Sequence, residues 1–184
     1  MRPKKRDAPE LTDPETPKPK RFKRRVALAW ILVLFWGGLI WTLGGDNFSF
    51  ADTNDAIFPW LDWLTGNLDY RTRYRIFVGI RKSAHFVEYG ILALLTFRAA
   101  LLAAPKNRLA TAGWTALFIV AALASADEVR QAFSPVRTGS AYDVLLDLAG
   151  GLIAVLVVLI LSRRLRQTSS DHREPPDPHL EASG

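Results

Sequence analysis

The chain has 184 residues, and its 24 Lys and Arg residues outnumber 18 Asp and Glu, giving a formal net charge of +6. The absence of cysteine excludes disulfides and thiolate chemistry. The mean hydropathy is close to zero, but it averages polar ends with long apolar segments and so hides a membrane protein. We expect no nucleic-acid binding, because the basic residues concentrate beside apolar segments, where they orient a membrane chain and attract anionic lipids.

The chain opens on a polar segment that leads into a first membrane span. Residues 1–25 carry ten Lys and Arg and are rich in proline, so they cannot bury enough apolar surface to fold and are predicted to be a disordered tail. Val26–Leu43 has 18 residues without a charge, enough to cross the hydrocarbon layer at about 1.5 Å per residue. A cleaved signal peptide is the alternative, since Ser49–Ala51 resembles a cleavage site. We favour a retained helix, because the polar lead and the apolar run are both too long for a signal peptide.

Three more spans are predicted after a long connection. Within that connection, residues 59–80 interleave aromatic residues and arginines at helical spacing, which favours a segment lying at the lipid headgroups. The further spans cover about residues 83–104, 109–126 and 143–161, and a second polar, disordered tail follows from residue 162 to 184. The second span is long enough only if His85 and Tyr89 lie within its first turns.

The expected fold is therefore all-α: a polytopic bundle of four membrane helices with both termini on one side. Basic clusters at residues 20–25, 106–108 and 163–166 share that side. The positive-inside rule then places it in the cytoplasm, as expected for a multi-pass protein of a bacterial inner membrane. The basic residues between Arg71 and Lys82 fall on the opposite side, so they require an interfacial or functional role of their own.

Polar residues gather at the outer ends of three spans. Lys82, His85 and Tyr89 share one helical stripe, and Asp143, Asp147 and Gly150 share another. An ionisable group facing hydrocarbon costs about 2.5–3.5 kcal/mol on insertion scales, so we expect both stripes to face the bundle interior and line one polar pocket. The predicted binding residues are Lys82, His85, Tyr89, Glu128, Gln131, Arg137, Asp143 and Asp147.

Each group in this set admits two roles. His85 and Glu128 are the candidate catalytic residues, as general acid or base, although His85 could simply bond to Glu128 or an aspartate at a helix start. Lys82 and Arg137 suit a phosphate or carboxylate ligand, or they balance the acidic residues. Asp127 is expected only to cap a helix exit in water.

The carboxylates could also bind a divalent cation. Glu128, Asp143 and Asp147 offer the oxygen ligands that magnesium or calcium prefers. We favour an internal ion-pair network instead, because Lys82 and Arg137 can neutralise these acids. No metal and no cofactor is therefore predicted.

The spacing of these residues resembles that of a known family. The pattern Lys82-x2-His85-x3-Tyr89, followed by Glu128-x2-Gln131-x5-Arg137-x5-Asp143-x3-Asp147-x2-Gly150, is similar to the VanZ-like family of small membrane proteins over about residues 30–161. The resemblance implies a role in the cell envelope, since the best-known member is associated with teicoplanin resistance. Two positions depart from the pattern: Asp147 stands where the family usually has Asn, and Ala154 where it often has a second Gly.

Three functions follow as hypotheses. We favour a protein that binds or handles an amphiphilic envelope molecule, such as a lipid-linked cell-wall precursor or a lipoglycopeptide, with membrane lipids as partners. The alternatives are a membrane enzyme acting on a phosphate- or acyl-bearing headgroup, with His85 or Glu128 as general base, and a structural partner subunit held together by a buried ion network.

Overall fold

The computed structural model describes residues 19–45, 68–104, 108–134 and 139–171, together with Pro59, Trp60, Asp62, Trp63 and Gly66. Four long helices lie in these ranges: α1 (Pro19–Leu43), α3 (Tyr70–Ala103), α4 (Leu109–Ala132) and α5 (Ala141–Asp171). Each is long and apolar enough to cross a membrane. The predicted all-α fold with four candidate spans is confirmed.

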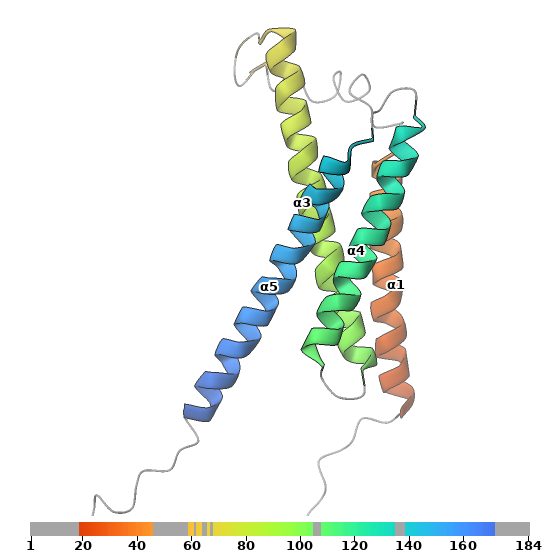
Figure 1. Cartoon of the computed structure of the whole chain (residues 1–184), viewed down its shortest axis with the longest axis vertical. Helices are drawn as coiled ribbons and strands as arrows, with labels where there is room; N and C mark the ends of the chain where they lie inside the picture. Colours follow the sequence, from red (N-terminus) through yellow and green to blue (C-terminus); the bar gives the residue numbers. More distant parts are fainter. Residues whose placement is uncertain are drawn as a thin grey trace, which may run out of the picture.

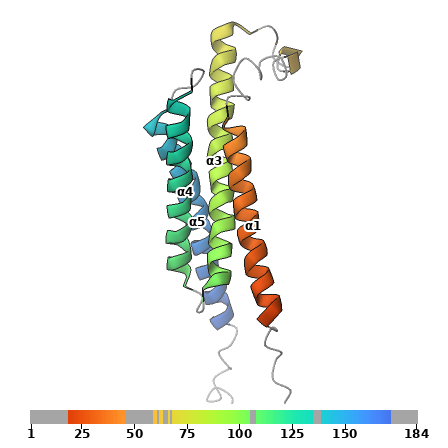
Figure 2. The ribbon, with the colours of Figure 1, turned by 90° about the vertical axis from the view of Figure 1, so that its right-hand side faces the viewer.

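Successive helices run in opposite directions, so the chain forms an up-and-down bundle (Figure 1). The start of α1 and the end of α5 lie at the same end, which we call the terminal end. At the other end, called the distal end, α1 and α4 finish and α3 and α5 begin. The two views agree on this arrangement (Figure 2). All four helices therefore have one end at the distal end.

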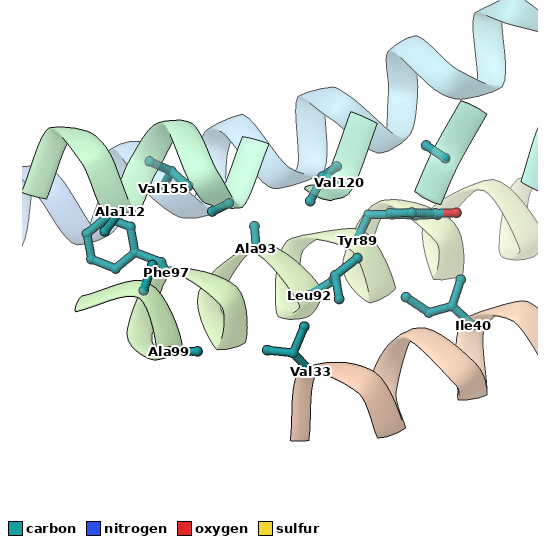
Figure 3. Packing of buried hydrophobic residues seen from close by; sticks show 13 residues of the cluster. Val33, Ile40, Tyr89, Leu92, Ala93, Phe97, Ala99, Ala112, Val120 and Val155 are labelled. Carbon is teal, nitrogen blue, oxygen red and sulfur yellow. The ribbon is translucent and has the colours of Figure 1, made fainter. Parts of the chain in front are cut away.

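Helix α3 is the centre of the bundle, since it packs against α1, α4 and α5, and α4 also packs against α5. Its buried face carries Tyr89, Leu92, Ala93 and Phe97 (Figure 3). Helix α4 meets it with small buried residues spaced four apart: Ala112, Ala116, Val120 and Ala124. This stripe lets the backbones approach closely, as helices in membranes require.

The outer surface of the bundle is apolar. Leu34 on α1, Trp114 and Phe118 on α4, and Leu145 on α5 all expose most of their side chains. Water would penalise such a surface, whereas lipid acyl chains accept it. The exposed side chains thus support the assignment of these helices as membrane spans.

Helix α3 begins earlier than the predicted second span. It starts at Tyr70 and has 34 residues, so it extends about 51 Å and projects beyond the other helices at the distal end (Figures 1 and 2). Asp69 caps this start by accepting hydrogen bonds from the backbone N–H and the hydroxyl of Thr72. The hydroxyl bond chiefly holds the pKa of the Asp69 carboxyl below its ordinary value.

Residues 70–80 are continuous with the helix that contains the predicted span from residue 83, and the predicted interfacial position of residues 59–80 stays a prediction. The arginines at 71, 73 and 75 lower the local hydropathy, but arginine forms helices well. Hydropathy marks where a chain enters hydrocarbon, not where its helix begins.

The other helices also outrun their predicted spans. Helix α1 starts at Pro19 and α5 ends at Asp171, because Lys, Arg and Gln continue a helix beyond the membrane. The predicted tails are therefore too long at residues 19–25 and 162–171, while residues 1–18 and 172–184 lie outside the described residues.

Candidate functional site

A group of charged and polar side chains is buried at the distal end. Asp127, Glu128 and Gln131 on α4 are only 1%, 7% and 3% exposed, and Asp147 on α5 is 2% exposed. Ionisable groups at such depth in a membrane bundle are rare and usually functional. We call the following residues the polar cluster: Arg81, Lys82, His85, Tyr89, Asp127, Glu128, Arg130, Gln131, Asp143 and Asp147.

One side of the polar cluster joins α3 to α5. The ammonium of Lys82 forms an ion pair with the carboxylate of Asp143, and both side chains stay about one-third exposed. One turn further into the bundle, His85 Nδ1 lies 3.9 Å from Asp147 Oδ1. The His85 ring stacks on the Tyr89 ring with centroids 6.2 Å apart. The two predicted stripes therefore face each other.

The other side of the polar cluster is a chain of hydrogen bonds across three helices. Arg81 donates to Gln131 Oε1 over 2.7 Å, and Gln131 Nε2 donates to Asp127 Oδ2 over 2.7 Å. Arg130 forms an ion pair with Asp127 and donates to the Trp41 carbonyl oxygen over 2.8 Å. Asp127 thereby connects α4 to α3 through Gln131 and to α1 through Arg130.

Glu128 ties the start of α5 to the end of α4. Its Oε2 accepts a 2.6 Å hydrogen bond from the backbone N–H of Ser140, which precedes the first turn of α5. A carboxylate at a helix start also interacts favourably with the helix dipole. Close to this contact, a Cβ on Gly139 would lie 2.5 Å from the carbonyl oxygen of Glu128. The loop therefore needs glycine at this position.

The register between α3 and α5 is set where the two backbones touch. A Cβ on Gly150 would lie only 2.2 Å from the carbonyl oxygen of Phe86, and one on Gly90 would lie 3.5 Å from that of Gly150. This crossing holds Asp147, one turn earlier on α5, opposite His85. The expectation that Gly150 permits close packing is confirmed.

Two buried oxygens in the polar cluster lack hydrogen-bond partners among the described residues. They are Asp147 Oδ1 and Tyr89 Oη. The 3.9 Å separation between Asp147 Oδ1 and His85 Nδ1 exceeds hydrogen-bonding distance. An unsatisfied buried polar group costs about 1–3 kcal/mol, so each of these atoms calls for an explanation.

Comparison with known proteins identifies the family. The family model described as VanZ/LLP1 matches residues 26–162. The chain belongs to the VanZ/LLP1 family. Searches of curated proteins and of solved structures gave no match. The resemblance predicted from the spaced polar residues is confirmed, and the chain is a multi-pass membrane protein of this family.

In this VanZ/LLP1 protein, seven of the eight predicted binding residues lie at the distal end of α3, α4 and α5. Arg137, the eighth, lies outside the described residues. Within the part of the chain that the structure describes, no three His, Asp or Glu side chains form a group that could hold a metal ion.

Three members of the polar cluster in this VanZ/LLP1 protein were not among the predicted binding residues: Arg81, Asp127 and Arg130. The role expected for Asp127 is wrong, because α4 continues to Ala132 and keeps this side chain buried instead of capping an exit in water. One available signal was the i, i+3 spacing of Asp127 and Arg130, which places them on the same helix face.

Proposed function

We propose that this VanZ/LLP1 protein binds an amphiphilic cell-envelope molecule by its charged headgroup, using the polar cluster in a pocket at the distal end. The class of ligand includes lipid-linked cell-wall precursors and lipoglycopeptides. The observation that carries the proposal is the pair of buried, unpartnered oxygens, Asp147 Oδ1 and Tyr89 Oη. A network that served stability alone would be expected to satisfy all its members, because half-satisfied polar networks destabilise a core.

Charge distribution supports a distal end that faces away from the cytoplasm of a bacterial inner membrane. The terminal end carries Lys20 to Arg25 on α1, Arg108 before α4, and Arg163 and Arg164 on α5. Basic residues next to membrane spans favour the cytoplasmic side. A distal cluster would then meet molecules of the outer leaflet.

The edge of the polar cluster presents both charged and apolar side chains to a ligand. Lys82 and Asp143 are partly exposed, and the Lys82 ammonium lies 5.2 Å from the centroid of the exposed Tyr142 ring. Leu145, also exposed, follows on the outer face of α5. An amphiphile could place its headgroup against Lys82 and its acyl chains along the outer surface of α5.

The test is lipid binding to the protein purified in mild detergent, with phosphatidylglycerol and phosphatidylethanolamine as probes and native mass spectrometry as readout. We expect Lys82→Ala to weaken binding by about tenfold or more, since a charge-assisted hydrogen bond contributes about 1.5–3 kcal/mol. Arg98→Ala, which removes an exposed cation near the terminal end of the same helix, is the matched control. Equal binding by the two folded variants and the unmodified protein would refute the proposal.

One observation favours a second candidate function. His85 faces the Asp147 carboxylate at 3.9 Å, and a carboxylate beside an imidazole is the arrangement that orients a general base. An enzyme acting on a headgroup would release product from one of the same phospholipids, and His85→Ala would abolish that release. Binding without turnover would favour the first function.

A further inference from the structure

Among the described residues, the polar cluster has more carboxylates than cations. Its three cations are Arg81, Lys82 and Arg130, and its four carboxylates are Asp127, Glu128, Asp143 and Asp147. Lys82 pairs with Asp143 and Arg130 with Asp127. Arg81 lies within electrostatic range of Glu128. Of these seven groups, Asp147 is the one left over.

The surroundings of Asp147 add negative charge instead of removing it. The carboxylates of Glu128, Asp143 and Glu88 all lie within electrostatic range of Asp147. The one basic side chain at ion-pair distance in the described structure is His85, and it is too far away for a hydrogen bond. A ligand cation with N–H donors would compensate a buried carboxylate in such a place.

Tyr89 gives a second, independent indication of the ligand. Its side chain is fully buried, and its hydroxyl has no hydrogen-bond partner among the described residues. Figure 3 shows this hydroxyl pointing away from Phe97 and toward the part of the view where Ile40 lies, which is the distal side. The stacked His85 ring links it to Asp147, and the Tyr89 and Asp147 side chains lie within electrostatic range of each other.

A primary ammonium matches what these two oxygens lack. It carries a positive charge and three N–H donors, so it can bond to a carboxylate and a phenol oxygen together. A quaternary ammonium has the charge without a donor, and a hydroxyl has one donor without the charge. Lys82 lies about two turns nearer the distal end than Tyr89 on α3, and it can meet an anionic group on the same ligand.

We propose that the ligand is an amphiphile with a primary ammonium beside an anionic group, and that Asp147 selects for this ammonium. This proposal rests on the headgroup-binding function proposed above and adds the chemical class of the headgroup. Lys82 serves binding in general, whereas Asp147 serves discrimination between headgroups.

The experiment compares three phospholipids with identical acyl chains on the purified full chain. Phosphatidylethanolamine has a primary ammonium, phosphatidylcholine a quaternary one, and phosphatidylglycerol none. We expect the unmodified protein to bind phosphatidylethanolamine at least about tenfold more tightly than either of the others. Asp147→Asn, which keeps the shape of the side chain, should remove this preference. Asp69→Asn, the same change at an exposed helix cap, should keep it.

Competition distinguishes the possible sources of the ammonium. Glycerophosphoethanolamine has the same headgroup without acyl chains. If it competes as well as the lipid does, the ligand is a water-soluble amine, and if it does not, the ligand is a membrane lipid. The second result supports the amphiphile proposed here, whereas the first would overturn the amphiphile and leave the site for a primary ammonium in place.

The two proposals fail in different ways. If all three lipids bound equally well and their binding depended on Lys82, the ammonium assignment would be overturned and headgroup binding would be left intact. A preference for phosphatidylethanolamine that survives in Asp147→Asn would have the same consequence. Binding of none of the lipids would overturn the proposed function itself. If Asp147→Asn does not fold, the preference of the unmodified protein decides, and a preference for phosphatidylcholine or phosphatidylglycerol would overturn the assignment.

Discussion

Asp127 holds three helices together through its two carboxylate oxygens. One accepts from Arg130, which also binds the end of α1, and the other accepts from Gln131, which also binds Arg81 on α3. The position is nearly inaccessible to solvent. Loss of this carboxylate would leave Arg130 and Gln131 without their shared acceptor.

We therefore expect Asp127→Ala to lower the free energy of unfolding by about 1–3 kcal/mol, the cost of leaving buried polar partners unsatisfied. The measurement is thermal unfolding in detergent, followed by circular dichroism. Arg75→Ala removes an exposed charge on α3 and should change the melting temperature little. An Asp127→Ala protein as stable as the Arg75→Ala control would show that the network contributes nothing to stability.

At the same scale, helical spacing predicted part of the polar cluster. Lys82 and His85 share a stripe, as do Asp143 and Asp147, and the structure pairs these stripes in register. The bond between Arg81 and Gln131 was not predictable, because it depends on how two helices rotate against each other. Spacing within one helix carries no information about that rotation.

At the scale of elements, the contact between α3 and α5 determines the geometry of the cluster. The carbonyl oxygen of Phe86 occupies the space that any side chain at Gly150 would need. Because this obstacle is backbone, a rotamer change cannot relieve it. The helices would have to separate, and His85 would move away from Asp147.

Gly150→Ala should accordingly destabilise the bundle by about 1–3 kcal/mol, as overpacking does, and weaken headgroup binding as well. Gly38→Ala is the matched control, since a Cβ on Gly38 in α1 meets nothing within 4 Å. The control should leave stability unchanged or raise it slightly, because alanine favours a helix more than glycine does. Identical melting temperatures for the two variants would contradict the close crossing of α3 and α5.

The number and type of these elements were predictable from hydropathy, but their ends were not. Leu109 was predicted correctly as the start of α4. Charged residues misled the prediction at the start of α3 and the end of α4, where Arg71 continues a helix and Asp127 is buried. A charge lowers hydropathy equally in solvent, at the headgroups and inside a polar cluster.

For the whole molecule, the orientation in the membrane decides which molecules reach the polar cluster. The chain contains no cysteine, so single cysteines can report which side each end occupies. We expect a membrane-impermeant thiol reagent to label Arg75→Cys in intact spheroplasts. Arg164→Cys should react only after the membrane is permeabilised, since it lies at the terminal end. The opposite labelling pattern would place the polar cluster in the cytoplasm.

The most direct test of headgroup binding is an experimental structure of the protein purified with its native lipids. Our expectation is headgroup density at the distal end between α3 and α5, with polar atoms within hydrogen-bonding distance of Lys82 Nζ or Asp147 Oδ1. Lipid density confined to the apolar outer surface, with no ligand at these two residues, would contradict it.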